Sequence, residues 1–379
     1  MSSAWRRRSL CVPLRRLFAT RPVVRSAGGL LAGLLVGLHI GLWGLTLGAA
    51  GLGRAEAAPA APLPEPGTAV AAGPDMSPQA WLQRVQQAAA AHSYEGTVVF
   101  SSGGVMSSSR VGHYRRGAES FERIEALDGR EQRRYRHDEV VMTLWPAERV
   151  ATTARRDVAA QPGLLPGLEP RLQQHYELRL LGADRVAGRS VQVVLLRPRD
   201  AWRYAQRLWA DQLTGLLLRA DVLAPEGAVL ESSAFTEVKF GVVGGQASVL
   251  IPMRSVTGWR QVHLGSQEIQ LEQEGWTLGP LPAGFSLVGA VRKALALPAD
   301  PAVREAPAST VQAVFSDGLA RVSVFIEPVQ GPRRPAFMTQ LGATHTLARS
   351  VGADHWLTLM GDVPLPTLKA IAGVLQRRP

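Results

Sequence analysis

The chain has 379 residues and a formal net charge of +11, with 42 Lys and Arg residues against 31 Asp and Glu residues. That length predicts about two domains with room for a sizeable core. Residues 1–57 hold eight of the basic residues and one of the acidic residues, so the rest of the chain carries 34 basic and 30 acidic residues, a net charge of +4. A balance this close to neutral argues against a nucleic-acid partner.

The first 57 residues have the three parts of an export signal. Seven arginines precede the uncharged apolar stretch Ser26–Gly53, and Ala55-Glu56-Ala57 supplies a small-residue cleavage pattern. The apolar stretch is long enough to span a bilayer, so an uncleaved anchor is the competing interpretation. We favour cleavage after Ala57 and expect a periplasmic protein. Cys11, the only cysteine, lies in this leader, so the processed chain would form no disulfide.

The next segment, residues 58–76, is rich in Ala and Pro and is typical of a flexible tether. A helix is expected after it, because Ser77 has the chemistry of a helix N-cap and Pro78 suits the first helical position. Apolar residues then recur at helical spacing until the helix ends near His92.

From residue 94 onward the apolar pattern changes to the period of a β-strand. Five short strands separated by turn residues are expected at 94–101, 110–116, 120–127, 132–137 and 140–145. The uncharged Gly/Ser-rich residues 102–109 suggest a mobile hairpin tip, and residues 161–170, with three prolines, indicate a loop. Five further strands are expected at 176–181, 191–197, 201–210, 216–223 and 229–240. We therefore predict a half-open antiparallel β-barrel wrapping a helix over residues 77–240.

Residues 241–273 are expected to form a linker plus an edge strand, followed by a smaller α+β domain over residues 274–379. Within it, Asp317-Gly318 predicts a tight hairpin turn between two strands. Residues 364–378 carry an amphipathic helical pattern. The fold class expected for the whole chain is therefore α+β.

The sequence contains no motif that predicts catalysis. It has no nucleophile elbow, no phosphate-binding loop and no dinucleotide fingerprint. The histidines lack metal-ligand spacing, so we expect no metal, no cofactor and no enzymatic activity. A hydrolase stays as a distant alternative, because serine triads are recognised by geometry.

An arginine-rich stretch between residues 110 and 137 allows two interpretations. It can be a docking face for an anionic lipid head group or an acidic peptide, because arginine binds phosphate and carboxylate groups. It can also be an ordinary solvated sheet face balanced by acidic neighbours, which we prefer. The apolar strand residues similarly form a plain core or line an acyl-chain cavity. The candidate ligand-binding residues are Trp81, Phe100, Arg110, Arg115, Arg116, Arg133, Arg134 and Trp145.

Several segments in order resemble the RseB/MucB family of sigma-E (AlgU) regulators. They include "WLQRVQQAAAAHSYEGTVVF" at 81–100, "RIEALDGRE" at 123–131, "YELRLLGADRVAGRSVQVVLLRPRDAWRYAQRLWAD" at 176–211, "LPAGF" at 281–285 and "FSDGLARVSVFIEP" at 315–328. The resemblance implies an N-terminal domain similar to the lipoprotein carriers LolA and LolB. It also implies a C-terminal domain that helps to bind the periplasmic part of an RseA/MucA-type anti-sigma factor.

The resemblance further implies that the bound protein shields the anti-sigma factor from regulated proteolysis. Lipopolysaccharide or a similar envelope-stress ligand is expected to release it. The candidate partner-binding residues, chosen from the 312–328 hairpin, are Phe315, Asp317, Arg321 and Phe325. A periplasmic lipid or lipoprotein carrier is the alternative function, although a carrier has little need of the second domain.

Overall fold

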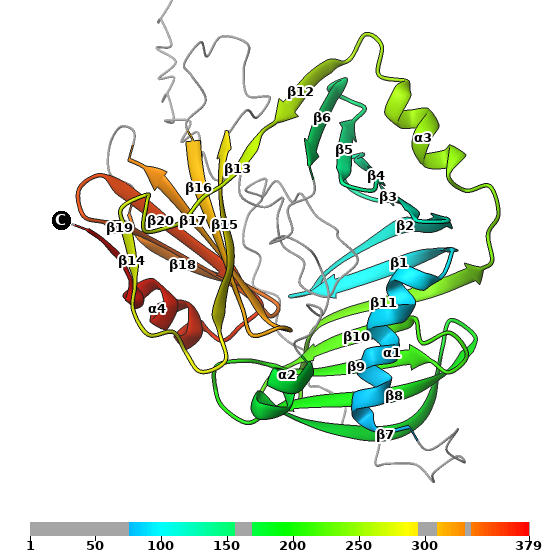
Figure 1. Cartoon of the computed structure of the whole chain (residues 1–379). Helices are drawn as coiled ribbons and strands as arrows, with labels where there is room; N and C mark the ends of the chain where they lie inside the picture. The colour runs from blue at the N-terminus through cyan, green and yellow to red at the C-terminus, as the bar shows by residue number, and fades with distance from the viewer. Residues whose placement is uncertain (1–75, 156–168, 295–308, 330–334, 379) are drawn as a thin grey trace, which may run out of the picture.

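The computed structural model describes residues 76–155, 169–294, 309–329 and 335–378, so the leader, most of the tether and the 161–168 loop lie outside the described residues. The described chain forms two large β-sheets with four helices (Figure 1). No helix within these ranges is long and apolar enough to cross a membrane. The expected combination of a half-open β-sheet domain with a second, smaller domain is confirmed.

The first helix, α1 (Pro78–Ala91), begins and ends where the sequence predicted. Ser77 is its N-cap, with the Ser77 hydroxyl oxygen accepting a hydrogen bond from the Ala80 amide at 3.2 Å. Pro78 needs no amide partner in the first turn. Trp81, Leu82 and Val85 are buried, and they face the first sheet.

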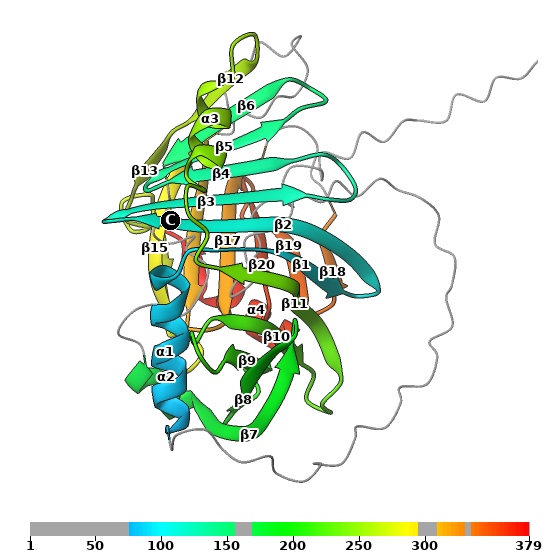
Figure 2. The same ribbon diagram turned by 90° about the vertical axis from the view of Figure 1, so that its right-hand side faces the viewer.

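The first sheet has twelve strands in the order β12-β6-β5-β4-β3-β2-β1-β11-β10-β9-β8-β7, and it stays open between β12 and β7 (Figure 2). Consecutive strands pair antiparallel, whereas β12 pairs parallel with β6. The bounds are β1 (Tyr94–Ser102), β2 (Val105–Arg116), β3 (Glu119–Ala126), β4 (Arg133–His137), β5 (Val140–Trp145), β6 (Val150–Arg155), β7 (Tyr176–Val186), β8 (Arg189–Pro198), β9 (Ala205–Asp211), β10 (Leu217–Leu223), β11 (Val229–Phe240) and β12 (Arg260–Leu264). A short helix, α2 (Glu169–His175), precedes β7.

The two faces of this sheet carry different helices. On one face, α1 packs on Val194, Leu208 and Ala220. On the other, α3 (Ala247–Arg254) packs on Tyr114, Phe121, Tyr135, Met142 and Leu144. Side chains alternate between faces along each strand, so the strand register assigns every residue to the α1 face or the α3 face.

Three details of the first domain differ from the sequence prediction. Strand β6 was not predicted, because residues 150–155 carry no strict alternation. The segment expected as linker plus edge strand contains α3 and two edge strands, β12 and β13 (Ser266–Glu268). The Gly/Ser-rich stretch is not a long tip: Gly103 and Gly104 make the turn, both with positive φ, and β2 already begins at Val105.

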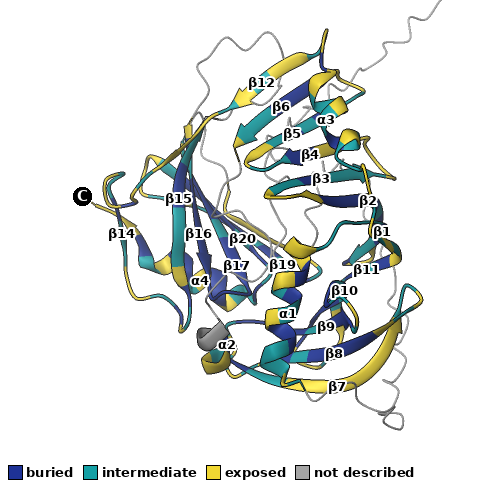
Figure 3. Ribbon diagram, turned by 45° about the vertical axis from the view of Figure 1, so that its right-hand side comes forward, coloured by how far each residue is buried: buried dark blue, intermediate teal, exposed yellow. Residues whose placement is uncertain are grey.

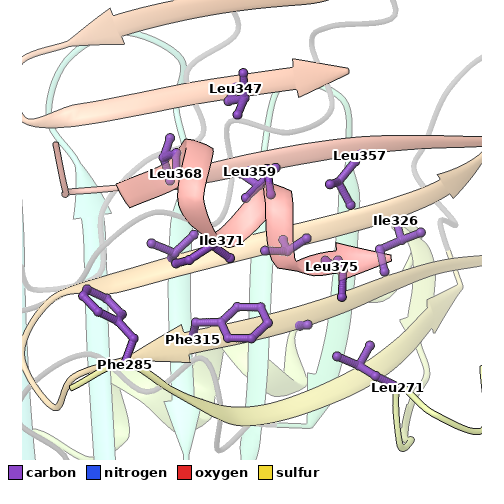
Figure 4. Packing of buried hydrophobic residues seen from close by; sticks show 14 of the residues in the cluster. Leu271, Phe285, Phe315, Ile326, Leu347, Leu357, Leu359, Leu368, Ile371 and Leu375 are labelled. Atoms are coloured by element: carbon purple, nitrogen blue, oxygen red, sulfur yellow. The ribbon is translucent and has the colours of Figure 1, made fainter. Parts of the chain in front are cut away.

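The second sheet has seven strands in the order β13-β15-β16-β17-β20-β19-β18. Helix α4 (Leu365–Val374) covers one face, where Phe315, Leu359, Leu368 and Ile371 form a buried cluster (Figure 4). A two-stranded sheet pairs β14 (Trp276–Leu278) with β21 (Leu375–Arg377). The remaining bounds are β15 (Ser286–Ala294), β16 (Ser309–Ser316), β17 (Arg321–Pro328), β18 (Phe337–Leu341), β19 (Thr344–Val351) and β20 (His355–Gly361).

The hairpin predicted at Asp317-Gly318 is present, but its turn is longer than two residues. Ser316 pairs with Arg321, which leaves residues 317–320 in the turn, and only Gly318 has positive φ. The Asp317 side chain itself closes the turn by accepting hydrogen bonds from the amides of Leu319 and Ala320. Both faces of β17 are largely buried (Figure 3).

Candidate functional site

The two domains meet where two hairpin turns of the second sheet reach the first domain. The β16–β17 turn (residues 317–320) contacts α2, β7 and the loop before β9, and the β18–β19 turn (residues 342–343) contacts β10, β11 and β1. We call these contacts the first and second junctions. They decide how the two sheets are held together, so they are the candidate site for any regulation by domain movement.

Asp317 is the centre of the first junction. One oxygen of its carboxylate lies 2.7 Å from Arg203 Nη1 and 2.9 Å from the Tyr176 hydroxyl, both of which belong to the first domain. The other oxygen accepts the two turn amides of its own hairpin. Every lone pair of the carboxylate that points into the junction therefore has a donor.

The Arg203–Asp317 pair is fully buried, with both side chains 0 % exposed. Arg203 also donates to Asp200 at 3.1 Å and to the carbonyl oxygen of Ala283, and its guanidinium lies over the rings of Tyr176 and Phe285. Burial, followed by the negative charge of Asp317, raises the pKa of Tyr176 well above its usual value, so the hydroxyl stays a donor. Because burying two charges is expensive unless all their hydrogen bonds are made, this saturated arrangement tolerates little movement.

Apolar contacts surround this ion pair. Leu319, at the tip of the second-domain turn, is 1 % exposed and packs in the same cluster as Trp81 and Leu208 of the first domain. In return, Trp202 of the first domain packs on the core of the second, and its carbonyl oxygen accepts a hydrogen bond from the Thr367 hydroxyl at 2.7 Å. Each domain thus contributes a residue to the core of the other.

The second junction is centred on Glu231 of β11. One of its carboxylate oxygens accepts hydrogen bonds from the Ser102 hydroxyl at 2.9 Å, the Ala343 amide at 3.1 Å and the Thr344 hydroxyl at 3.2 Å. Ala343 is buried against Tyr204 and Val222 of the first domain. Here a carboxylate of the first domain accepts from the hairpin turn of the second, whereas in the first junction the carboxylate belongs to the hairpin turn itself.

The four candidate partner-binding residues are all buried in this arrangement. Phe315 lies in the core under α4, and Asp317 lies in the first junction. Arg321 and Phe325 are less than a tenth exposed, and burial lowers the pKa of the Arg321 guanidinium. Direct contact of Asp317 with a partner would therefore require the domains to move apart, and contact of Phe315 would require the core under α4 to open.

The eight candidate ligand-binding residues do not form one surface. Trp81 is buried between α1, to which it belongs, and the first sheet. The strand register places Phe100, Arg115, Arg134 and Trp145 on the α1 face of the first sheet. Arg110, Arg116 and Arg133 lie on the opposite, α3 face, where Arg116 covers the Phe121 ring.

The acidic residues between these arginines act largely as ion-pair partners. Arg116 lies 2.8 Å from Glu119, Arg133 lies 2.6 Å from Glu131, and Arg136 pairs with Glu122. This pairing is what a mixed, solvated sheet face predicts, and exposed pairs of this kind contribute little stability. The pairing supports the interpretation of most of the arginine stretch as an ordinary solvated sheet face balanced by acidic neighbours.

Two other clusters in the described chain have ordinary structural roles. Glu119, His137 and Asp138 bring three possible metal ligands together, but Glu119 is paired with Arg116, Asp138 accepts the Ser120 amide, and His137 stacks on Phe121. A pocket of about 370 Å³ lies between the β7–β8 and β9–β10 turns. Its two charged side chains, Arg189 and Asp211, are paired with each other at 2.5 Å.

The sequence did not indicate Arg203, Tyr176 or Glu231 as site residues. Arg203 and Tyr176 were quoted only as part of a family-like segment, and Glu231 lay in a predicted strand. Their partners are more than 100 residues away along the chain, so no local pattern reveals them.

Two open sheets joined by buried polar contacts define a two-domain β-sheet protein. Residues 77–256 match the MucB/RseB N-terminal domain, and residues 270–376 match the MucB/RseB C-terminal domain. The chain belongs to the MucB/RseB family.

Curated relatives carry the names of sigma-factor regulators. The sigma factor AlgU regulatory protein MucB of Pseudomonas aeruginosa is 30% identical over 307 residues, which cover 77% of this chain and 88% of the relative. The sigma-E factor regulatory protein RseB of Haemophilus influenzae is 28% identical over 311 residues, covering 80% and 92%. The family is thus one of regulatory proteins, as the sequence resemblance implied.

Solved structures agree with this assignment. The crystal structure of MucB in complex with MucA(peri) has a TM-score of 0.59 and 27% identity, covering 80% of this chain and all of that one. The complex of Pseudomonas aeruginosa MucA and MucB has a TM-score of 0.60 and 28% identity, covering 80% and 99%.

Proposed function

We propose that this protein is a periplasmic negative regulator of a sigma-E-type envelope stress response. In this proposal it binds the periplasmic part of a transmembrane anti-sigma factor and shields that factor from regulated proteolysis. The carrying observation is that both domains match the family whose solved members include complexes with MucA. The expected export signal supports the periplasmic location.

The proposal is tested by recovering the partner directly. The tagged chain is incubated with solubilised envelope from its own bacterium, and the retained proteins are identified by mass spectrometry. A single-pass protein with a cytoplasmic sigma-binding domain is the expected partner. Deletion of the gene should also raise sigma-factor output in a reporter strain, and unchanged output would contradict the proposal.

We further propose that lipopolysaccharide, or another lipid-like ligand, releases the protein by acting on the α1 face of the first sheet. Four of the candidate ligand-binding residues, Phe100, Arg115, Arg134 and Trp145, share that face. The two junctions hold the same sheet against the second domain, so a ligand that shifts the sheet changes the junction geometry. Partner and ligand would then weaken each other's binding by the same coupling free energy.

The two faces of the sheet provide a matched test of this release. Substituting Arg115→Ala and Arg134→Ala on the α1 face should weaken lipopolysaccharide-induced release of the partner. The control, Arg110→Ala with Arg133→Ala, removes two arginines from the same two strands but from the α3 face. Equal loss in both double variants would show that only overall charge matters, and would contradict an α1-face site.

The carrier alternative gains little from the structure. Leu319 of the second domain packs in the core of the first, and Trp202 of the first packs on the core of the second. The second domain is therefore an integral part of the described fold. Candidate partner residue Asp317 then has an indirect role in our proposal: it holds the domains in the arrangement that the partner recognises.

A further inference from the structure

Among the residues that the structure describes, one strand of the second sheet has an edge with no strand paired to it. β18 (Phe337–Leu341) is the last strand beyond β19, and all five of its residues are exposed. A strand at the end of a sheet presents backbone amides and carbonyls that can pair with another extended chain. Figure 2 shows β18 at the side of the molecule where β1 and β2 also end.

The composition of β18 distinguishes it from the other end strands of the two large sheets. β7 carries Glu177, Arg179 and further charges, β12 carries Arg260, and β13 carries Glu268. β18 reads Phe-Met-Thr-Gln-Leu and has no charged residue. Charged side chains are a common protection against unwanted strand pairing, so β18 is the end strand left competent to accept a partner.

Exposed apolar side chains continue from β18 onto the first domain. Phe337, Met338 and Leu341 are 42–55 % exposed, and Val105 and Met106 at the β1–β2 turn are 44 % and 69 % exposed. The two groups are adjacent, because a Cβ placed on Gly103 would lie 2.7 Å from Leu341 Cδ1. We call residues 105–106 and 337–341 the edge surface, and it includes both domains.

We infer that the edge surface binds an extended, largely apolar segment of the anti-sigma factor's periplasmic part by adding it as a further strand beside β18. This inference rests on the proposed function. A polypeptide fits this surface because backbone pairing needs another backbone, and alternate side chains of the added strand would meet Met338 and Leu341. The absence of charge on β18 does not favour a lipid head group as the occupant.

The position of the edge surface links binding to the domain arrangement. The β18–β19 turn is the part of the second sheet that Glu231 holds in the second junction. A segment that pairs with β18 and also covers Met106 therefore binds only when that junction is closed. Opening the junction would divide the surface and release the segment.

Substitution on β18 tests the inference. Met338→Lys with Thr339→Lys adds two edge charges at exposed positions, and it should weaken binding of the anti-sigma factor's purified periplasmic part by at least about tenfold. The matched control is Leu213→Lys, because Leu213 is an exposed leucine at the β9–β10 turn. Circular dichroism of each variant verifies that it is folded.

Site-specific cross-linking gives a second readout that does not depend on affinity. In a Cys11→Ser background, Met338→Cys carrying a photo-cross-linker should link to the anti-sigma segment, whereas Leu213→Cys should not. Backbone amides of residues 337–341 should also exchange hydrogen more slowly in the complex, as an added strand requires.

The possible results separate this inference from the proposed function. If the wild-type chain does not bind the periplasmic part at all, the proposed function fails, and this inference fails with it. If wild type and the β18 variant bind equally, or position 338 cross-links to a second copy of this chain, the inference alone is overturned. Selective loss in the β18 variant together with cross-linking from 338 supports it.

Discussion

Asp317 shows how much one side chain can contribute when it is buried between domains. We expect Asp317→Asn to lower the free energy of unfolding by about 3–5 kcal/mol, because it removes the buried counter-charge of Arg203 and leaves only the partly exposed Asp200 to pair with it. Urea unfolding would measure the loss, with Asp354→Asn as the control at an exposed aspartate. A loss below about 1 kcal/mol would mean that the pair behaves like an exposed ion pair.

His113 predicts a pH dependence at the same scale. Burial lowers its pKa, with Arg136 and Arg115 acting in the same direction, while its bond to the His92 carbonyl and the charge of Glu122 act against the shift. The unfolded chain, with an ordinary histidine pKa of about 6.5, then binds more protons than the folded chain. The stability that neutral, buried His113 contributes is therefore fully present above a pH of about 6.5. It is lost as the pH falls from there through the lowered pKa of His113 in the folded chain.

The His113 prediction is checked by urea unfolding at several pH values between neutral and acidic. His113→Asn should flatten the decline of stability below the ordinary histidine pKa, because the titrating group is gone. His263→Asn, at an exposed histidine on β12, is the control for the substitution itself. An unchanged slope in His113→Asn would assign the pH dependence to other groups.

At the scale of single elements, two glycine turns of the second sheet offer a controlled comparison. Gly342 (φ +57°) and Gly352 (φ +61°) both occupy the left-handed region, so alanine at either should cost about 1–2 kcal/mol. A Cβ at Gly352 meets open space, whereas at Gly342 it would lie 2.2 Å from Ser102 Oγ and 2.8 Å from the Leu230 carbonyl oxygen. Gly342→Ala should therefore be the more destabilising, and it should also open the second junction.

Limited proteolysis and thermal unfolding distinguish these two effects. Gly352→Ala should reduce stability while leaving the protease pattern unchanged. Gly342→Ala should add new cleavage near the β1–β2 and β18–β19 turns. If both variants behave alike, the second junction is loose enough to accommodate the added methyl group.

At the scale of the whole molecule, the junctions predict that the domains unfold together. We expect one calorimetric transition for wild type, because Leu319 of the second domain packs in the core of the first and Trp202 of the first packs on the core of the second. Leu319→Ala should cost about 2–5 kcal/mol and divide the transition into two. Leu368→Ala, in the core of the second domain alone, should destabilise without this uncoupling. Two transitions already in wild type would contradict the prediction.

Much of the architecture was predictable from local patterns. The Ser77 cap, the Pro78 start and the alternating strands gave the correct helix and most strands of the first domain, because these signals act within a few residues. Strand β6 and helix α3 were missed, because their local patterns are weak. Ala151 of β6 and Val249 of α3 belong to one buried cluster although they are 98 residues apart in the chain. The candidate site residues were chosen by the chemistry of their side chains, and the sequence alone could not assign them to a face of the sheet.

By itself, the sequence predicted an export-type leader, indicated a two-domain β-rich organisation and showed the resemblance to a regulator family. Composition, turn residues and the order of family-like segments along the chain can be read from the sequence without knowing which residues are in contact. Only the tertiary structure decided that Asp317 is a buried interdomain partner of Arg203 and Tyr176, and that the candidate arginines divide between two faces of the sheet. Those outcomes depend on the register of paired strands and on contacts between residues far apart in the chain, which no local pattern encodes.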